Sequence, residues 1–410
     1  MHVVVVGGGA IGMSIAYSLS RRGAEVTVLD ANEIGHGASF GNAGLVVPSY
    51  GLPLANFANA MEGLRSLLRL HSQIDVRLPL DSSSLGWIVR FLLSTRKTIV
   101  DRGLAILAGF SQRSLALYDE LLADAPADVD FAKFGTMYAS LSSRSQNRMV
   151  SLAGRLKRVG VSSVVFNGNE ARAHEPTLSS NVVGAVWYPD DRRLQPLNFV
   201  RMLAERAVKH GTEVIKTRAV GIALEEKRAR GVQTEARLIE ADRVVIAAGC
   251  WSTFVARSVG LDIPMQPAKG YSFDIRLERN PRTALLFCEE HVSLTPLNDV
   301  TRATTGHDFH GYDPSIDPRR LDKIHKACKL YLEGPSIIHE GEPWSGFRPL
   351  TPDGLPIIGS SSRIENLAFA TGHAGLGITL APATGEAIAG DLLDGVAELP
   401  NEMLPGRFGL

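Results

Sequence analysis

The spacing of apolar and polar positions changes several times along the chain. Near the N-terminus four consecutive valines (3–6) run into a glycine cluster, and apolar positions at helical spacing follow over 13–22. A second apolar run over 25–29 ends at an acidic residue. A short apolar run bounded by glycine indicates a buried strand, and a period near 3.6 indicates a helix. The first thirty residues therefore predict a strand–helix–strand unit.

The glycine cluster of this unit places Gly7, Gly9 and Gly12 at the spacing G-x-G-x-x-G. In dinucleotide-binding folds the first glycine permits a sharp turn, the second lets a pyrophosphate approach the backbone, and the third lets the helix pack on the sheet. The helix N-terminus would then face the phosphates. Asp30, at the end of the second strand, is placed to accept hydrogen bonds from a ribose diol. The motif predicts dinucleotide binding but does not separate FAD from NAD.

The remaining chain alternates between two patterns. Strands and helices alternate over 145–262, beginning with a basic amphipathic helix whose charges we interpret as a solvated face. Helical spacing dominates 51–144, and short strands with turn signals dominate 263–342. Further strands are expected at 133–139, 164–166, 213–220, 243–249 and 271–275, and further helices at 104–122, 199–210 and 321–332.

The C-terminal region repeats the strand, glycine loop and helix order of the N-terminus. A strand over 367–370 leads into a glycine-rich loop over 371–377, and a helix follows from 378 to about 393. Such a helix N-terminus could stabilise negative charge on a reduced isoalloxazine ring. An NAD enzyme of ordinary layout has no need of this second unit, so the sequence favours FAD.

Composition narrows the class of protein. The 410 residues are 45% hydrophobic and 21% charged, which suits two folded domains. The 43 basic and 43 acidic residues cancel, so nothing indicates a nucleic-acid partner. The three cysteines are scattered without a C-x-x-C pair, which predicts no disulfide framework and no metal site and fits a reducing compartment.

Signal-peptide and membrane-span patterns in a sequence bear on localisation. The N-terminal apolar run lacks a basic n-region and a cleavage site, and no apolar run approaches the length of a membrane span. We therefore expect a cytoplasmic protein. Residues 85–100 mix apolar and basic side chains and could lie on the inner face of a membrane, although a helix covering the substrate domain is the favoured interpretation.

Taken together, the motifs resemble the FAD-dependent D-amino-acid dehydrogenase and glycine oxidase family of D-amino-acid oxidase-like amine oxidoreductases. The resemblance covers most of the chain and is weakest over 51–144. Besides the first glycine motif it rests on Ala38-Ser39-x-x-Asn42-Ala43-Gly44, Val244 to Ser252, Lys269-Gly270-Tyr271-Ser272, Trp344-x-Gly346-x-Arg348-Pro349-x-Thr351-Pro352-Asp353, Thr371-Gly372-His373 and Ala381-Pro382-Ala383-Thr384-Gly385.

The resemblance implies an α/β fold in which a discontinuous Rossmann-like FAD-binding domain accompanies an α+β substrate domain with a mixed or antiparallel sheet. The FAD domain would comprise 1–50, 145–262 and 343–410, and the substrate domain 51–144 and 263–342. FAD would bind non-covalently along residues from both glycine loops and the segments beside them: Gly7, Gly9, Ala10, Ile11, Gly12, Asp30, Ala31, Ala38, Ser39, Asn42, Ala43, Gly44, Leu45, Val220, Ala248, Gly249, His373, Gly375, Leu376, Gly377, Ile378 and Thr379.

In relatives, the arginine that corresponds to Arg348 anchors the substrate carboxylate, a role that suits a planar and permanently charged guanidinium. The alternative is a structural arginine on a turn. Tyr271 is a second catalytic candidate that could bind the carboxylate or be a core tyrosine, and Lys269 is a third that could tune the flavin or be solvated. His307 and His310 lie in a glycine-bounded turn at the edge of the expected pocket.

The implied reaction is FAD-dependent oxidative deamination or dehydrogenation of a D-amino acid, or of a cyclic D-imino acid such as D-proline or hydroxy-D-proline. Hydride would pass from Cα to flavin N5. The alternatives are an enzyme for another N-substituted amino acid (sarcosine or an opine), a flavoprotein subunit of a larger complex, and an NAD-linked dehydrogenase. The electron acceptor stays open between quinone, oxygen and a partner subunit.

One position and one segment depart from the family pattern. Relatives of the glycine oxidase type can carry a second arginine where this chain has Gly375, which weakens the case for glycine or sarcosine as substrate. The segment 190–196, with two aspartates and two arginines, replaces a more usual glycine-rich stretch.

Overall fold

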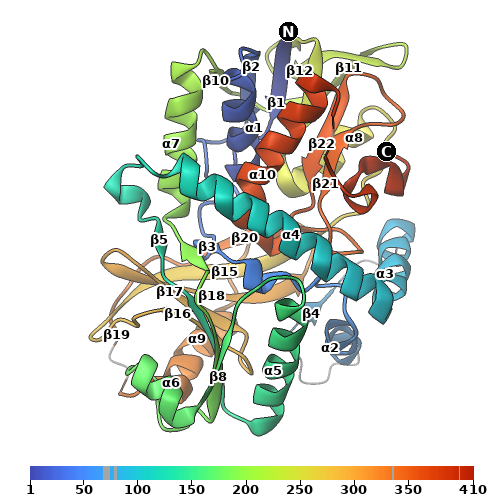
Figure 1. Cartoon of the computed structure of the whole chain (residues 1–410). Helices are drawn as coiled ribbons and strands as arrows, with labels where there is room; N and C mark the ends of the chain where they lie inside the picture. The colour runs from blue at the N-terminus through green and yellow to red at the C-terminus, as the bar shows by residue number, and fades with distance from the viewer. Residues whose placement is uncertain (68–73, 78–80, 335–336, 397) are drawn as a thin grey trace.

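The computed structural model describes residues 1–67, 74–77, 81–334, 337–396 and 398–410 (Figure 1). Two large sheets organise the described chain. Both termini lie with the first sheet, in the upper half of Figure 1, and the second sheet fills the lower half. The long helix α4 (Lys97–Leu121) runs across the molecule between them.

The first sheet has six strands in the order β10-β2-β1-β14-β22-β21. All neighbours are parallel except the last pair. The strands are β1 (His2–Val6), β2 (Glu25–Asp30), β10 (Glu213–Lys216), β14 (Arg243–Ile246), β21 (Ile357–Ser360) and β22 (Leu367–Thr371). One face packs against α1 (Ala10–Ser20), α7 (Pro196–Lys209) and α10 (Gly377–Ala389). The other packs against α8 (Ser252–Arg257) and a small sheet of β11 (Ala219–Glu225), β12 (Arg228–Thr234) and β13 (Leu238–Glu240).

The valine run of β1 shows why this strand is apolar throughout. Val3 and Val5 belong to the core on the side of α1, whereas Val4 and Val6 belong to the core on the side of α8. Alternate side chains of a strand point to opposite faces, so a strand covered on both faces needs apolar residues at every position. The predicted strand–helix–strand unit is confirmed.

The second sheet has ten strands and is mostly antiparallel. Its main path runs β19-β15-β18-β17-β16-β6-β8-β7, with β20 added on β15 and β4 on β18. These are β4 (Asp75–Val76), β6 (Thr136–Ser140), β7 (Val164–Asn167), β8 (Gly184–Tyr188), β15 (Gln266–Leu277), β16 (Ala284–Phe287), β17 (Val292–Leu297), β18 (Val300–Phe309), β19 (Ile337–Glu340) and β20 (Trp344–Leu350). Helices around it are α2 (Phe57–Leu67), α3 (Ser82–Ser94), α5 (Ser143–Lys157), α6 (Gly168–His174) and α9 (Pro318–Tyr331).

A third, very short sheet joins segments near the cavity described below: β3 (Leu45–Val46), β9 (Arg192–Arg193) and β5 (Ala132–Lys133). The α/β class and the mixed second sheet agree with the prediction. Across the described residues, no helix combines the length and apolar character needed to cross a bilayer.

Several local predictions were wrong. The strand expected over 213–220 is two strands in different sheets, β10 and β11, separated by Thr217 and Arg218. The strand expected over 133–139 is likewise split between β5 and β6. Gly306 lies inside β18, where the pairing with β15 shifts register, and not in a turn. The last helix agrees with its predicted bounds, because α10 over Gly377–Ala389 continues as a π-helical turn over Gly390–Asp394.

Strand pairing also departs from the predicted domain division. β7 and β8 fall in the range 145–262, assigned to the FAD domain, yet they pair with each other and with β6 in the ten-stranded sheet. β20, in the range 343–410, pairs with β15 of that sheet. Strand pairing is non-local, so the alternation of strands and helices cannot tell which sheet a strand joins.

Candidate active site

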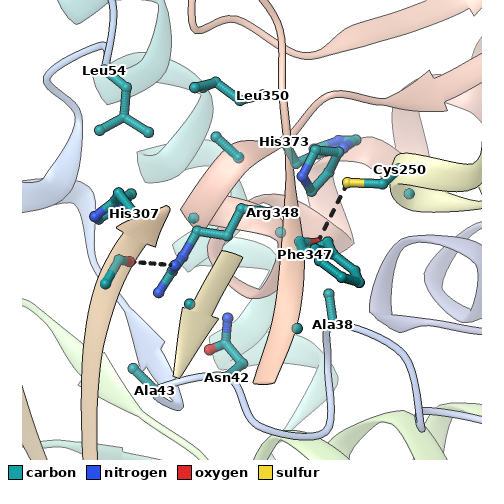
Figure 2. A pocket seen from close by; sticks show the side chains of 18 of the residues that line it. Ala38, Asn42, Ala43, Leu54, Cys250, His307, Phe347, Arg348, Leu350 and His373 are labelled. Carbon is teal, nitrogen blue, oxygen red and sulfur yellow. Dashed lines mark hydrogen bonds between the residues drawn. The ribbon is translucent and has the colours of Figure 1, made fainter. Parts of the chain in front are cut away.

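One cavity of about 1390 Å³ lies between the two large sheets. Its walls include Gly7 and Gly9 of the early loop and Gly375 of the late loop. His373 of the late loop and Arg348 of β20 also line it (Figure 2). Pockets for drug-sized ligands span roughly 300–1,000 Å³. This cavity exceeds that range, so it has room for a large cofactor together with a small substrate.

The early loop has the geometry of a phosphate cradle. Gly7 has a φ of +112°, and a Cβ there would lie 2.5 Å from the carbonyl oxygen of Ala247. Gly9 is the N-cap of α1 and carries no side chain that could block its N-terminus. A Cβ on Gly12 would lie 1.8 Å from the Gly7 oxygen, so Gly12 serves close packing and does not line the cavity. These are the three tasks predicted for the glycines.

Asp30 lines the cavity at the end of β2. Its carboxylate accepts hydrogen bonds from the backbone N–H groups of Gly8 (2.7 Å) and Asn32 (2.8 Å). A carboxylate has about four acceptor positions, so these two bonds leave capacity for a ribose hydroxyl. Asp30 therefore also fixes the glycine loop, a role that the sequence motif alone did not predict.

The segment after β2 threads along the cavity, and Ala38, Asn42 and Ala43 are seen there in Figure 2. The hydroxyl of Ser39 accepts a hydrogen bond from the N–H of Ala10, 3.0 Å away at the start of α1. Asn42 Oδ1 accepts one from the N–H of Gly44 (2.9 Å). Gly44 itself lies off the cavity, with a φ of +74° that makes the turn.

The late loop joins β22 to α10. Burial lowers the pKa of His373 to about 3, so its ring is neutral, and its Nε2 lies 3.1 Å from the hydroxyl of Thr384. His373, Gly375, Gly377 and Ile378 line the cavity. The predicted cofactor contacts Leu376 and Thr379 do not line it: Leu376 is a core residue, and the Thr379 hydroxyl bonds backbone atoms of β3 and the residue after it.

Arg348 points into the cavity from β20 (Figure 2). Its Nη1 donates to the carbonyl oxygen of Gly306 (2.9 Å), and its guanidinium lies over Gly270, where a Cβ would be 2.0 Å from Nη1. Among the described residues it forms no ion pair. Burial lowers the pKa of Arg348, but an arginine remains charged near neutral pH. A half-buried cation that faces a cavity and has no carboxylate partner among the described residues is suited to bind an anionic ligand.

Two further residues flank this guanidinium. Tyr50 faces Gly375, with its Cε1 3.7 Å from the Cβ position there, and burial raises its pKa. Burial first, and the charge of Arg348 second, lower the pKa of His307 well below its usual value, so its ring is neutral. His307 was anticipated at the pocket edge, and it lines the cavity. Tyr50 was missed, because a tyrosine in a short 3-10 turn carries no sequence signal.

The other two catalytic candidates take structural positions. Tyr271 lines the cavity, but its hydroxyl donates to Asp308 (2.9 Å), which also pairs with Arg320. Lys269 is 1% exposed and off the cavity wall, and its Nζ donates to the carbonyl of Ser315 (2.9 Å). The interpretation of Lys269 as a solvated side chain was therefore wrong.

Most of the other predicted cofactor contacts lie on the cavity wall. Ala10, Ile11, Ala31, Leu45, Val220, Ala248 and Gly249 all line the cavity. His310 does not, and its Nε2 lies 3.0 Å from Asp75. In helix α5 the charges of Arg144, Arg148 and Lys157 are exposed, in agreement with the predicted solvated face. The same helix also contributes Arg148, Met149, Leu152 and Arg155 to the cavity wall.

Residues 2–390 match the family described as DAO, FAD dependent oxidoreductase. The chain belongs to this family. It is 28% identical to the D-amino acid dehydrogenase of Helicobacter pylori over 402 residues, covering 97% of this chain and 96% of that one. It is 29% identical to the enzyme of the same name from Vibrio cholerae over 410 residues, with the same coverage.

Solved structures share the fold. Glycine oxidase from Bacillus cereus superposes with a TM-score of 0.76 at 22% identity, covering 98% of this chain and 97% of that one. L-proline dehydrogenase from P. horikoshii gives a TM-score of 0.79 at 22% identity, covering 99% and 97%. The chain is thus an FAD-dependent oxidoreductase, and the early glycine cradle, the late loop and the long cavity fit that cofactor.

Proposed function

We propose that this enzyme oxidises the Cα–N bond of a D-amino acid or of a cyclic D-imino acid such as D-proline or hydroxy-D-proline. The observation that carries the proposal is Arg348, a half-buried guanidinium that faces the cavity and has no ion-pair partner among the described residues. The full-length relatives named D-amino acid dehydrogenase support this substrate class.

In this proposal Arg348 binds the substrate carboxylate, ideally through two parallel N–H···O bonds. Its bond to Gly306 and its contact with Gly270 fix the plane of the guanidinium before substrate arrives, which favours one orientation of Cα. The neutral rings of Tyr50 and His307 flank it without adding a competing charge. FAD, when bound, supplies the chemistry by accepting hydride from the substrate.

The wall beside Arg348 suits an uncharged side chain. Leu54 and Leu350 lie on one side of the guanidinium in Figure 2, and Phe347 lies on another. An apolar surface excludes water and strengthens the ion pair with a carboxylate. It also accommodates the methylene groups of a ring such as that of proline.

The test is an anaerobic panel of D-amino acids, L-amino acids, D-proline, hydroxy-D-proline, sarcosine and opines, followed by loss of flavin absorbance. We expect bleaching by D-substrates, and Arg348→Ala should raise the substrate concentration for half-maximal bleaching by roughly 100-fold or more. Arg172→Ala is the matched control, because Arg172 also donates to a backbone carbonyl (Val182, 3.0 Å) but lies off the cavity.

The outcomes separate the alternatives. Bleaching by sarcosine or opines alone would move the proposal to N-substituted amino acids. An unreactive flavin would favour a subunit that only relays electrons. If Arg348→Ala behaved like Arg172→Ala, the anchoring role would be wrong.

We further propose that helix α3 attaches the enzyme peripherally to a membrane. Leu85, Val89 and Leu93 are 48%, 56% and 49% exposed, and the basic Arg90 and Arg96 are exposed beside them. Such a face suits an anionic bilayer surface. Sedimentation with phosphatidylglycerol vesicles should be lost in the variant Leu85→Ser/Val89→Ser. Equal sedimentation of both proteins would contradict the proposal.

A further inference from the structure

A buried arginine of the second sheet holds the loop that lines the cofactor end of the cavity. Arg302, on β18, is 8% exposed. Its Nε and Nη2 pair with the two carboxylate oxygens of Asp274 at 2.8 and 3.0 Å. Its Nη1 donates to the carbonyl oxygens of Phe40 (3.0 Å) and Asn42 (3.2 Å). Four of the five N–H groups of the guanidinium thus have partners in a fixed plane.

The carbonyls that Arg302 binds belong to the segment that threads along the cavity. Ala38, Ser39, Asn42 and Ala43 line it. Ser39 also accepts the N–H of Ala10, at the start of the helix that faces the phosphate cradle. The position of this one loop therefore affects both the cavity wall and the N-terminus of α1.

A second contact from the same sheet restrains the loop. Trp344, on β20, lies over Gly41, where a Cβ would be 1.9 Å from Cε3 of the indole. The loop is thus held by the ring on one side and by Arg302 through the flanking carbonyls. The segment is rich in small residues, which have little side-chain packing of their own, so these outside contacts must define its path.

We propose that Arg302 is a positioning residue for FAD: by fixing the carbonyls of Phe40 and Asn42, it makes cofactor affinity and the flavin environment depend on the second sheet. The proposal rests on the FAD-binding fold of the family and not on the identity of the substrate. Asp274 takes no part in the loop contacts and serves to orient the guanidinium.

The test compares Arg302→Lys, Arg302→Gln and Asp274→Asn. Lysine keeps the charge but has no planar fork, so it cannot hold Asp274 and both carbonyls together. We expect the FAD dissociation constant to rise roughly tenfold in Arg302→Lys and more in Arg302→Gln, as expected for lost bonds from a charged donor. The visible absorption bands of bound flavin should shift in both. Asp274→Asn should change affinity by less than about threefold, because the loop contacts remain.

Melting temperatures of the apoproteins distinguish positioning from general stability. If Asp274→Asn and Arg302→Gln lowered stability and FAD affinity in the same proportion, Arg302 would only support the fold. Unchanged FAD affinity and flavin spectrum in Arg302→Lys would also overturn the proposal, and this conservative variant decides the matter if Arg302→Gln does not fold. Substrate screening is independent, so a wrong substrate class leaves the result valid.

Discussion

Replacing Gly270 by alanine tests how tightly the structure fixes Arg348. Gly270 lies on β15 opposite Gly346 of β20, and the guanidinium passes directly over it. A Cβ at this position would be 2.0 Å from Nη1 and 2.5 Å from Cζ of Arg348. Gly270 is not among the residues with positive φ, so alanine is compatible with the backbone. The clash with the guanidinium is therefore the main perturbation.

The size of the expected effect follows from the hydrogen bond between Arg348 and Gly306 that the substitution breaks. To reach ordinary contact distance the guanidinium has to move by more than about 1 Å, which breaks its 2.9 Å bond to the Gly306 carbonyl. A hydrogen bond from a charged donor contributes about 1.5–3 kcal/mol, which corresponds to a loss in substrate affinity of roughly 10- to 150-fold. Replacing glycine by alanine in a strand stabilises the backbone by about 0.5–1 kcal/mol, which offsets part of this loss, so the free energy of unfolding should fall by about 0.5–2.5 kcal/mol.

The assay is anaerobic stopped-flow reduction of the flavin over a range of substrate concentrations, with thermal unfolding alongside. Gly109→Ala on α4 is the control, because no described heavy atom outside its own helix lies within 4 Å of the added Cβ. We expect a raised half-saturating concentration in Gly270→Ala and none in the control. A half-saturating concentration within about twofold of the wild type would refute the view that Arg348 is preorganised.

Three further predictions follow from burial and backbone geometry. Burial raises the pKa of Asp191 from 3.8 to about 7, so folding takes up a proton and the free energy of unfolding falls as the pH rises between these values. Asp191→Asn removes this titration, so its free energy of unfolding relative to that of the wild type should rise by at most about 4 kcal/mol from pH 4 to pH 8. Thermal unfolding over this pH range measures the difference. Tyr271→Phe should cost about 1–3 kcal/mol in denaturant unfolding, since Asp308 loses a donor, while half-saturation in flavin reduction stays within about threefold; a larger kinetic loss would restore a catalytic role to this tyrosine. Gly7→Ala should lose FAD on gel filtration, because a side chain there combines a φ of +112° with a Cβ 2.5 Å from a backbone oxygen; retention of a full flavin complement would contradict the cradle geometry.

The cofactor loops were predictable because their constraints are local. A valine run, a glycine at the turn and a helix period lie within thirty residues, and each has one physical interpretation. Arg348 could be named from its motif, but the motif does not show that the side chain lacks an ion-pair partner in the part of the chain that the structure describes. Whether Arg348 has an ion-pair partner depends on where the fold places the acidic residues, which the motif does not record.

Lys269 and Tyr271 show where the motif misleads. Both belong to a stretch shared with relatives, yet the Lys269 ammonium donates to Ser315 and the Tyr271 hydroxyl donates to Asp308. The partners lie 37 or more positions away in sequence. Conversely, Tyr50 reaches the cavity from a segment with no periodic pattern, and only the folded chain brings it beside Arg348.

The sequence by itself determined the two glycine loops and the buried strands before them, since these follow from backbone sterics and hydrophobic period over short distances, and the presence of both loops in one chain favoured FAD as the cofactor. The tertiary structure alone decided which strands share a sheet, which polar side chains face the cavity, and that Arg302 reaches across to the cofactor loop. The physical reason is that strand pairing and the burial of charge are contacts between distant segments, whose partners no local pattern records.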